Sequence, residues 1–324
     1  MKVVVTGAAG FIGYHLTKKL LKKKVKVYGI DNLNSYYSTQ LKKDRLKELK
    51  KYKNFIFYKK NLNNFNSNLK LFSKISPFAI YHLASQPGII YSYLNPNTYK
   101  NNNINATKNL IKISNIIKIN KFYFTSSSSV YGIKKKYPIK ESSKMKPINY
   151  YAKTKKDCEI LLLQKLSKKI DLKIFRPFTV YGPFSRPDML FIKYLSSYKS
   201  KKPFVLYNYG NYVRDFTYVD DVVDILFDFL KIGFLKKNIF NICSSKPVNI
   251  TKIVKLINKF YKKEKLVIYK KRRKGEMIKT FGDNRYLKKI IKKRKFMNIE
   301  KGIIKTINWY KDYKNKNNLL FHKF

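Results

Sequence analysis

The first thirty-one residues constrain the fold of this chain more than any other stretch. A short apolar run leads into three glycines and a helical pattern, and a second apolar run then ends at Asp31. The first apolar run is residues 3–5, and the glycines are Gly7, Gly10 and Gly13. The helical pattern covers residues 14–24, and the second apolar run covers residues 25–30. The order strand, glycine turn, helix, strand and acid predicts the first unit of a doubly wound α/β sheet that binds a dinucleotide.

Each part of this unit has a physical reason. Because glycine lacks Cβ, Gly7 can turn tightly off the strand, Gly10 lets a diphosphate approach the backbone, and Gly13 lets the helix pack closely on the sheet. The free N–H groups and the positive dipole end of the helix favour phosphates. Asp31 can accept both ribose hydroxyls and would repel a 2′-phosphate, which predicts NAD rather than NADP.

Two plainer explanations of this stretch fit less well. A buried strand and turn without a ligand would leave the helix, the second strand and the acid unexplained. A signal peptide would need an unbroken apolar run and a cleavage site, whereas this run is interrupted by glycines and feeds an amphipathic helix.

The formal net charge of +54 is the most unusual property of the composition. It raises nucleic-acid binding as an alternative function. The enriched residue types, however, are Lys, Asn, Ile, Tyr and Phe, whose codons are rich in A and T, and the lysines are spread over the whole chain. We therefore interpret the charge as the imprint of an AT-biased genome on solvated surfaces, and we expect no specific nucleic acid partner.

Other features of the composition restrict the cellular compartment and the kinds of ligand that we expect. No apolar run approaches the ~20 residues needed to span a bilayer, so we expect no membrane partner. Cys158 and Cys243 lack metal or redox spacing and suit a reducing cytoplasm. His15, His82 and His322 do not cluster, so we expect no metal.

Arginine is rare in this lysine-rich chain and occurs only eight times. An arginine kept in such a composition indicates a position that needs a planar fork of donors. Arg176, Arg186 and Arg214 lie within the motifs described below, whereas Arg45 and Arg294 lie in ordinary charged, helix-like stretches.

Beyond Asp31, apolar runs alternate with helical patterns. We expect strands over residues 55–58, 78–84, 122–124 and 172–176, and helices over residues 39–51, 66–75, 96–119 and 150–168. This alternation predicts a parallel, doubly wound (Rossmann) sheet whose carboxyl ends form one ligand-binding edge. The pattern changes after residue 176. We therefore expect an NAD-binding domain over residues 1–176 and a smaller α/β substrate-binding lobe over 177–324, with some segments returning to the first domain.

Candidate catalytic residues follow a later strand. A serine run ends this strand, and the next helix carries Tyr151 and Lys155, whose spacing places phenol and ammonium on one face. The ammonium and the positive nicotinamide favour the phenolate and so lower its pKa from the ordinary value of about 10. Tyr151 can then take a proton from a sugar hydroxyl while hydride leaves for the nicotinamide, with Ser127 or Ser128 bonded to the same oxygen. Tyr150 is a competing candidate.

On these residues the chain resembles the extended short-chain dehydrogenase/reductase family. Within it, the chain is most similar to the NAD-dependent nucleotide-sugar epimerases that act on UDP-glucuronate. The matching segments are residues 6–13, 31–37, 82–88, 126–132, 151–155, 176–183, 185–189 and 214–221. Segments 31–37 and 186–188 are the more specific to the glucuronate group.

The resemblance implies a 4-epimerase that interconverts UDP-glucuronate and UDP-galacturonate through a 4-keto intermediate, with NAD bound and not consumed. It implies NAD contacts at Gly7, Gly10, Phe11, Ile12, Gly13, Asp31, Asn32, Asn61, Leu62, Leu83, Ala84, Ser85, Tyr151 and Lys155. It implies catalytic roles for Tyr151, Lys155, Ser127 and Ser128, and substrate contacts at Gln86, Ser128, Ser129, Thr179, Arg186 and Arg214. It also implies a role in polysaccharide biosynthesis and a homodimer joined through the helices at 96–119 and 150–168.

Three positions depart from the pattern of the glucuronate group. Ile90 stands where the group usually has an arginine, which removes one candidate anion contact. Asn61 and Glu276 each stand where an aspartate is usual. These departures keep UDP-N-acetylglucosamine, or its uronate, open as an alternative substrate, and an inactive scaffold without NAD is a further alternative. Ser128 and Ser129 occupy places that are acidic in related dehydratases and decarboxylases, which argues against those two reactions.

Overall fold

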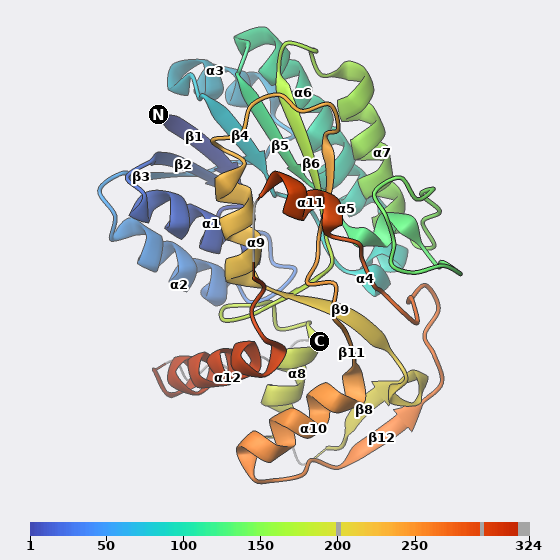
Figure 1. Cartoon of the computed structure of the whole chain (residues 1–324). Coiled ribbons are helices and arrows are strands. Elements are labelled where there is room, and N and C mark those ends of the chain that lie inside the picture. Colours follow the sequence, from blue (N-terminus) through green and yellow to red (C-terminus); the bar gives the residue numbers. More distant parts are fainter. Residues whose placement is uncertain (199–201, 292–294, 317–324) are drawn as a thin grey trace.

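A seven-stranded parallel sheet forms the centre of the protein (Figure 1). The structure, a computed structural model, describes residues 1–198, 202–291 and 295–316, so Arg294 and His322 lie outside it. The strands are β1 (Lys2–Thr6), β2 (Lys26–Asp31), β3 (Phe55–Lys59), β4 (Ala79–His82), β5 (Lys121–Thr125), β6 (Asp171–Pro177) and β10 (Ile239–Ile242). Their order is β10-β6-β5-β4-β1-β2-β3, which reverses between β1 and β4 and confirms the predicted doubly wound sheet.

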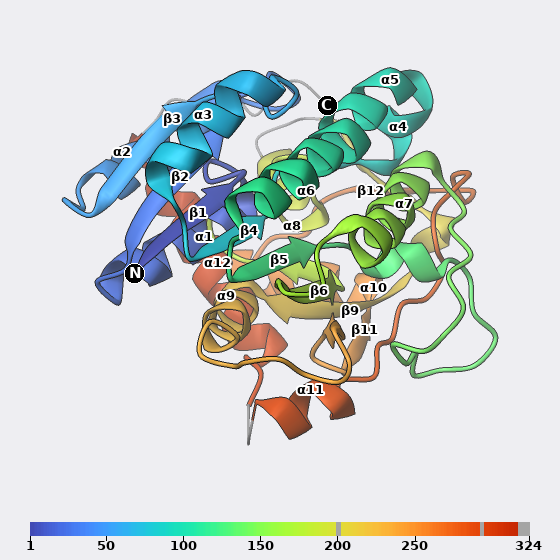
Figure 2. The same ribbon diagram turned by 90° about the horizontal axis from the view of Figure 1, so that it is seen from above.

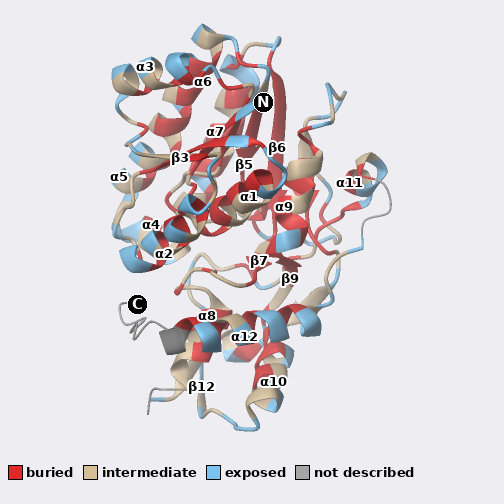
Figure 3. Cartoon of the chain, turned by 90° about the vertical axis from the view of Figure 1, so that its left-hand side faces the viewer, coloured by how far each residue is buried: buried red, intermediate tan, exposed pale blue. Residues whose placement is uncertain are grey.

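Helices cover both faces of this sheet (Figure 2). One face packs against α1 (Phe11–Lys22), α2 (Thr39–Lys50), α9 (Val219–Asp228) and α11 (Arg285–Ile290), and the other against α3 (Phe65–Ile75), α6 (Ala106–Ile117) and α7 (Tyr150–Lys165). Because successive strand residues point to opposite faces, Val3 and Val5 join the first core and Val4 joins the second. Figure 3 shows buried residues concentrated in the sheet and on the helix surfaces that face it.

A smaller lobe lies below the sheet in Figure 1. It contains β7 (Thr179–Tyr181), α8 (Leu190–Ser197), β8 (Phe204–Tyr207), β9 (Val213–Tyr218), β11 (Pro247–Asn249), α10 (Ile250–Tyr261), β12 (Val267–Lys270) and α12 (Ile299–Lys316). Strands β11-β9-β7 form one sheet and β12-β8 another, around an apolar core of their own. The chain passes repeatedly between the two bodies, since α9, β10 and α11 follow β9 in sequence but pack with the large sheet.

The helix expected over residues 96–119 contains a change of helix type. It consists of α5 (Pro96–Tyr99), a π-helical segment (Lys100–Asn105) and α6. Within the π-helical segment, buried Asn103 accepts a hydrogen bond from the Gln86 N–H (2.7 Å) and donates one to the Thr154 hydroxyl (2.9 Å). The wider π-helical turn directs the amide of Asn103 toward the interior. The many asparagines of this stretch indicate an exposed surface, so the helical periodicity alone could not predict that Asn103 is buried.

Raising the salt concentration should stabilise this fold against heat, because a net charge of +54 makes the compact protein repel itself. Salt shortens the Debye length from about 30 Å at 0.01 M to about 10 Å at 0.1 M. We expect the midpoint of unfolding to rise by about 2–5 °C between these concentrations, as measured by differential scanning calorimetry. A midpoint that falls would mean that favourable ion pairs outweigh the repulsion.

Candidate active site

A cavity of about 700 Å³ lies at the carboxyl edge of the large sheet, where it meets the smaller lobe. Its walls come from the segments that follow strands β1 to β6 and from residues of the smaller lobe. Of the site residues predicted from the sequence, the cavity is lined by Gly7, Gly10, Phe11, Ile12, Gly13, Asp31, Asn32, Asn61, Leu62, Leu83, Ala84, Ser85, Ser127, Ser128, Ser129, Tyr151, Lys155, Thr179, Arg186 and Arg214. The fold therefore brings together residues that are far apart in the sequence.

Gln86 is the exception, because it lies behind the cavity wall and not in its lining. Its side chain is 1% exposed, and its Oε1 accepts a hydrogen bond from Asn34 Nδ2 (3.3 Å). Its backbone N–H donates to Asn103 (2.7 Å). These contacts make Gln86 a support for the turn after β4. The motif in the sequence locates this turn at the site, but it does not reveal which way the side chain points.

The glycine turn after β1 has the close packing that a dinucleotide cradle needs. A Cβ added to Gly7 would lie 2.7 Å from the Ala84 nitrogen, and Gly7 has a φ of +73° that favours glycine. A Cβ on Gly13 would lie 2.0 Å from the Gly7 carbonyl oxygen. The turn leads into the N-terminus of α1, a helix of 12 residues whose first N–H groups lie at the cavity. This arrangement fits the diphosphate of NAD.

Asp31 ends β2 at the wall of the same cavity. Its Oδ2 accepts a hydrogen bond from the Ala9 N–H (3.1 Å) and its Oδ1 from the Leu33 N–H (2.8 Å). Each oxygen keeps a lone pair for a ribose hydroxyl. Burial raises the pKa of Asp31, while the charge of Lys42 and the two N–H bonds oppose this rise. Lys42 also lines the cavity, and nothing in the sequence distinguished it from the other lysines.

Replacing Asp31 by asparagine should weaken the preference for NAD over NADP by about tenfold or more, which corresponds to ~1.4 kcal/mol. The amide keeps the shape of the side chain but no longer repels a 2′-phosphate, and Lys42 remains beside it. Titration of the protein with each dinucleotide, followed by tyrosine and tryptophan fluorescence, gives the two affinities. An unchanged ratio would show that Asp31 does not select the cofactor.

Tyr151, Lys155 and Ser127 converge on the cavity. The first two lie one turn apart on α7, and Lys155 Nζ donates a hydrogen bond to the Thr125 carbonyl (2.8 Å) at the end of β5. Ser127 caps a short 3₁₀ helix, Ser128–Tyr131, and its hydroxyl accepts a hydrogen bond from the Ser129 N–H (3.2 Å). The competing candidate Tyr150 does not line the cavity. The geometry thus selects Tyr151 as the phenol that can meet a ligand.

The ionisation of these groups differs from the sequence-based expectation. Burial raises the pKa of Tyr151, and hydrogen bonding with Ser127 and the charge of Arg186 only partly offset this effect. Burial also lowers the pKa of Lys155 to about 8. Desolvation of the phenolate therefore outweighs the protein's own favourable charges. A lowered phenol pKa would require the positive nicotinamide as well.

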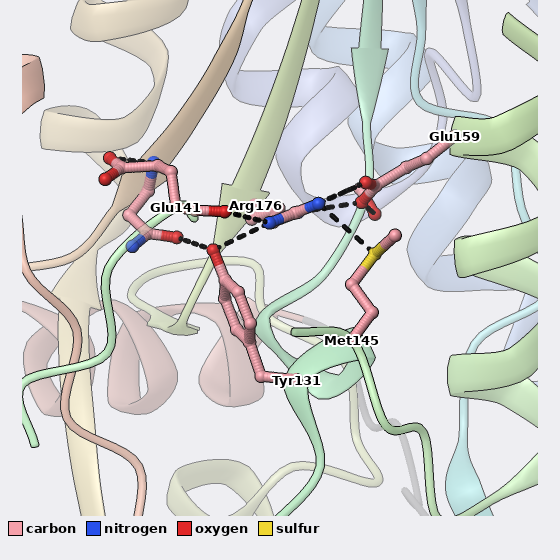
Figure 4. Close-up of polar contacts among 7 residues, drawn as sticks. Tyr131, Glu141, Met145, Glu159 and Arg176 are labelled. Atoms are coloured by element: carbon pink, nitrogen blue, oxygen red, sulfur yellow. Dashed lines mark hydrogen bonds and ion pairs between the residues drawn. The ribbon is translucent and has the colours of Figure 1, made fainter. Parts of the chain in front are cut away.

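Arg176 and Glu159 form a buried ion pair (Figure 4). The serine segment contacts this pair through Ser126. Arg176 of β6 donates hydrogen bonds to Glu159 of α7 from Nε (3.0 Å to Oε1) and from Nη2 (2.5 Å to Oε2). Arg176 Nη1 donates to the Tyr131 hydroxyl (2.9 Å), and the Ser126 hydroxyl donates to Glu159. Burial lowers the pKa of Arg176, but its bonds to Glu159 raise it above its ordinary value. The pair links β6 to α7 and holds the hydroxyl of Ser126, which precedes the catalytic candidate Ser127.

A second arginine pair lies elsewhere in the cavity wall. Arg186 donates two hydrogen bonds to Asp188, from Nε to Oδ1 (2.9 Å) and from Nη2 to Oδ2 (3.0 Å). The Tyr36 hydroxyl donates to the same carboxylate (3.2 Å). Burial lowers the pKa of Arg186, but Asp188 raises it above its ordinary value. Arg186 therefore stays charged, and donors that Asp188 does not use remain for an anionic ligand.

Arg214, a predicted substrate contact, lies in the wall near two cations that were not predicted as ligand contacts, Lys193 and Arg273. Arg214 Nη1 donates to the Val213 and Ile278 carbonyls, both at 3.0 Å, and its guanidinium shares the cavity with Lys193 and Arg273. Arg273 belongs to a basic run that the sequence could not separate from a solvated surface, and Lys193 is one lysine among many. The remaining unpredicted lining residues are Ile30, Asn34, Tyr36, Tyr37, Lys42, Lys60, Pro87, Gly88, Ile89, Ile90, Tyr91, Leu94, Asn102, Ala106, Thr125, Ser126, Pro177, Phe178, Val180, Asp188, Met189, Glu276, Met277 and Thr280.

Comparison with known proteins gives relatives over almost the whole chain. The chain is 35% identical over 313 residues to a UDP-glucuronate 4-epimerase of Thermodesulfobacterium geofontis, covering 95% of this chain and 96% of that protein. The crystal structure of a UDP-glucuronic acid 4-epimerase from Bacillus cereus, in complex with UDP-glucuronic acid and NAD, matches with a TM-score of 0.89 and 31% identity, over 97% of this chain and 100% of that one.

A third comparison concerns a different sugar. A UDP-N-acetylglucosamine 4-epimerase from Methanobrevibacter ruminantium M1 matches with a TM-score of 0.85 and 27% identity, over 96% of this chain and 98% of that one. Residues 3–243 also match the model of the NAD dependent epimerase/dehydratase family. These findings confirm the resemblance drawn from the sequence and NAD as the cofactor. The chain belongs to the NAD dependent epimerase/dehydratase family.

Proposed function

We propose that this protein is an NAD-dependent 4-epimerase that interconverts UDP-glucuronate and UDP-galacturonate. One observation carries the proposal. A partly buried phenol, Tyr151, lines the same cavity as the glycine turn and Asp31, while Arg186 and Arg214 supply cations in the wall contributed by the smaller lobe. This pattern suits a dinucleotide at one end and an anionic nucleotide sugar at the other. The UDP-glucuronate 4-epimerases among the relatives support the same substrate.

In this mechanism the protein's own groups hold the sugar and move one proton. Tyr151 takes the proton of the C4 hydroxyl and later returns it, while Ser127 donates a hydrogen bond to the same oxygen. The charge of Lys155, held by the Thr125 carbonyl, favours the phenolate. NAD, which the glycine turn and Asp31 would hold, would supply the acceptor and donor of hydride for C4.

The carboxylate of the sugar needs a site that binds it without promoting its loss as CO₂. The hydroxyls of Ser128, Ser129 and Thr179 line the cavity and can supply neutral donors. Arg186 stands among the lining residues as a cation already neutralised in part by Asp188. We infer that these groups bind the carboxylate without weakening the bond between it and the sugar ring, so that CO₂ is not lost.

UDP-N-acetylglucosamine, or its uronate, is the second candidate substrate, and Ile90 is the observation that favours it. Ile90 lines the cavity and is 41% exposed, so it offers an apolar surface that suits an acetyl methyl better than a carboxylate. The match to the epimerase from Methanobrevibacter ruminantium M1 is in line with this candidate.

Proton NMR of the purified protein with each UDP-sugar in turn decides between the two. We expect UDP-glucuronate to be converted into an equilibrium mixture with UDP-galacturonate, which is visible as new anomeric and H4 signals. If UDP-glucuronate stays unchanged while UDP-N-acetylglucosamine inverts at C4, the substrate is the second candidate. If no sugar reacts and no NAD is retained, the protein is an inactive scaffold.

We also propose that the protein is a homodimer in a reducing, cytoplasmic setting, where it contributes to polysaccharide biosynthesis. The exposed apolar side chains Ile116 of α6 and Leu163 of α7 support the dimer, and the two buried, free cysteines support the compartment. No helix in the described ranges is long and apolar enough to cross a membrane. Sedimentation velocity at micromolar concentration tests the dimer, and a monomer there would contradict it.

A further inference from the structure

Arg45 is completely buried although it lies in the charged helix α2. The sequence placed Arg45 in an ordinary charged, helix-like stretch, and nothing there indicated its burial. A buried cation is costly unless it is well bonded. Among the described residues Arg45 forms no ion pair, and its guanidinium is held by three neutral oxygens: the Ala9 carbonyl, the Tyr37 hydroxyl and the Phe184 carbonyl.

These oxygens belong to two different parts of the cavity wall. Arg45 Nη1 donates to the Ala9 carbonyl (2.8 Å) within the glycine turn, and the N–H of Ala9 donates to Asp31 (3.1 Å). Arg45 Nη2 donates to the Phe184 carbonyl (2.5 Å) in the loop between β7 and α8. That loop also carries Arg186 and its partner Asp188. The planar guanidinium of Arg45 therefore connects the glycine turn after β1 with the loop that carries Arg186.

The backbone of Phe184 has a strained conformation that needs support from its neighbours. Phe184 has a φ of +55°, a left-handed conformation that is unusual for a bulky residue. Its ring packs against Tyr14 of α1 (4.9 Å between ring centroids) and Trp309 of α12 (4.8 Å). The bond from Arg45 fixes the carbonyl of this strained residue, so loss of the bond should free the loop.

The segment after β2 makes a second connection between the same two places. Tyr37 accepts a hydrogen bond from Arg45 Nη1 (2.7 Å), and its neighbour Tyr36 donates to Asp188 (3.2 Å). Both tyrosines line the cavity, whereas Arg45 does not. Arg45 therefore lies behind the cavity wall and can affect the site only through the residues that it bonds to, Ala9, Tyr37 and Phe184.

We propose that Arg45 is a positioning residue that couples the two ends of the site, so that NAD binding orders the loop 182–189 and prepares Arg186 for the sugar. The proposal rests on the proposed function only for the identity of the ligand at Arg186. NAD fixes the glycine turn, Arg45 transmits this order to the Phe184 carbonyl, and the loop then closes on the sugar end. By linkage, a ligand at the loop strengthens NAD binding by the same factor.

Hydrogen exchange of the full chain, with and without saturating NAD, tests this coupling directly. In the wild type we expect NAD to slow exchange in peptides covering residues 182–189 by about tenfold. Arg45→Lys keeps the charge, but one ammonium cannot replace a fork that reaches the Ala9 and Phe184 carbonyls together. In this variant the slowing should drop below about twofold, while slowing at the glycine turn persists.

Lys43→Met is the matched control, because Lys43 is exposed on the same helix. It should behave like the wild type. Slowing of the loop that is equal in Arg45→Lys and the wild type, or absent from the wild type, would overturn the proposal. If Arg45→Lys is unfolded at the assay temperature, Tyr37→Phe takes its place. This variant removes one of the three oxygens that hold Arg45, and it should at least halve the slowing of the loop; full slowing would again overturn the proposal.

The assay separates this proposal from the proposed function. Exchange in the loop is read with NAD alone, so it gives an answer even if UDP-glucuronate proves not to be the substrate. A second arm measures the affinity for UDP-glucuronate with and without NAD in a Tyr151→Phe background, which prevents turnover. The gain in affinity caused by NAD should fall by about fivefold or more when Arg45 is also replaced by lysine. An unchanged gain would contradict coupling through Arg45.

Discussion

Replacing Tyr151 by phenylalanine should reduce kcat for the interconversion of UDP-glucuronate and UDP-galacturonate by about 10²–10⁴-fold. The ring still fills the same space on α7, but the oxygen that takes and returns the proton is gone. NAD should stay bound, because the glycine turn and Asp31 are unchanged. NMR of the reaction mixture gives the rate, and release of NAD from denatured protein gives its occupancy.

Tyr150→Phe is the matched control for this variant, since Tyr150 precedes Tyr151 on the same helix but does not line the cavity. It should turn over within about twofold of the wild type. Full activity in Tyr151→Phe, or a large loss in Tyr150→Phe, would assign the proton transfer to another group.

The dependence of turnover on pH offers an independent check. Burial raises the pKa of Tyr151, so the phenolate is the minor form at neutral pH, and its fraction grows as pH rises. Turnover should therefore rise with pH from about 6 upward. Above pH about 8 the gain should level off, because Lys155 loses the proton whose charge favours the phenolate. A rate that falls steadily over this range would contradict a phenolate base.

Replacing Glu159 by glutamine should lower the free energy of unfolding by about 3–5 kcal/mol, which is the usual cost of leaving one member of a buried ion pair unpaired. The cation of Arg176 would remain buried with only neutral partners, among them the Tyr131 hydroxyl (2.9 Å) and the Glu141 carbonyl (3.0 Å). Urea unfolding followed by circular dichroism measures the loss. The activity should fall as well, since the Ser126 hydroxyl beside Ser127 would bond to a neutral amide oxygen in place of a carboxylate.

Glu48→Gln provides the comparison for a surface pair. Glu48 bonds to Lys51 (2.7 Å) with both side chains substantially exposed, so its replacement should change the free energy of unfolding by less than about 1 kcal/mol. Equal effects of the two substitutions would mean that burial of the Arg176 pair contributes nothing to stability.

The sequence predicted the fold and the lining of the cavity well, because both depend on short local patterns. Alternating apolar runs and helices imply a parallel sheet, and a parallel sheet collects the residues after its strands at one edge. The glycines, Asp31 and Tyr151 could therefore be placed without coordinates. Arg176 also makes the forked contact that its retention in a lysine-rich chain indicated.

Other features depend on contacts between distant segments and have no local signal. Arg45 lies in a helix whose composition indicates solvent exposure, and only the approach of Phe184 from the smaller lobe explains its burial. Asn103 of the π-helical turn bonds to the backbone of Gln86, and the hidden side chain of Gln86 bonds to Asn34 from the segment after β2. The raised pKa of Tyr151 follows from desolvation, which the spacing to Lys155 could not reveal.

The position of β10 in the sheet has a consequence for synthesis on the ribosome. This edge strand is paired with β6, yet it is translated only after β7, β8 and β9 of the smaller lobe have been made. Until residue 242 has left the exit tunnel, the nascent chain presents an open β6 edge, and until residue 228 has left it, the apolar face that α9 covers is also exposed. Premature release of the chain in this interval would leave that edge free for aggregation.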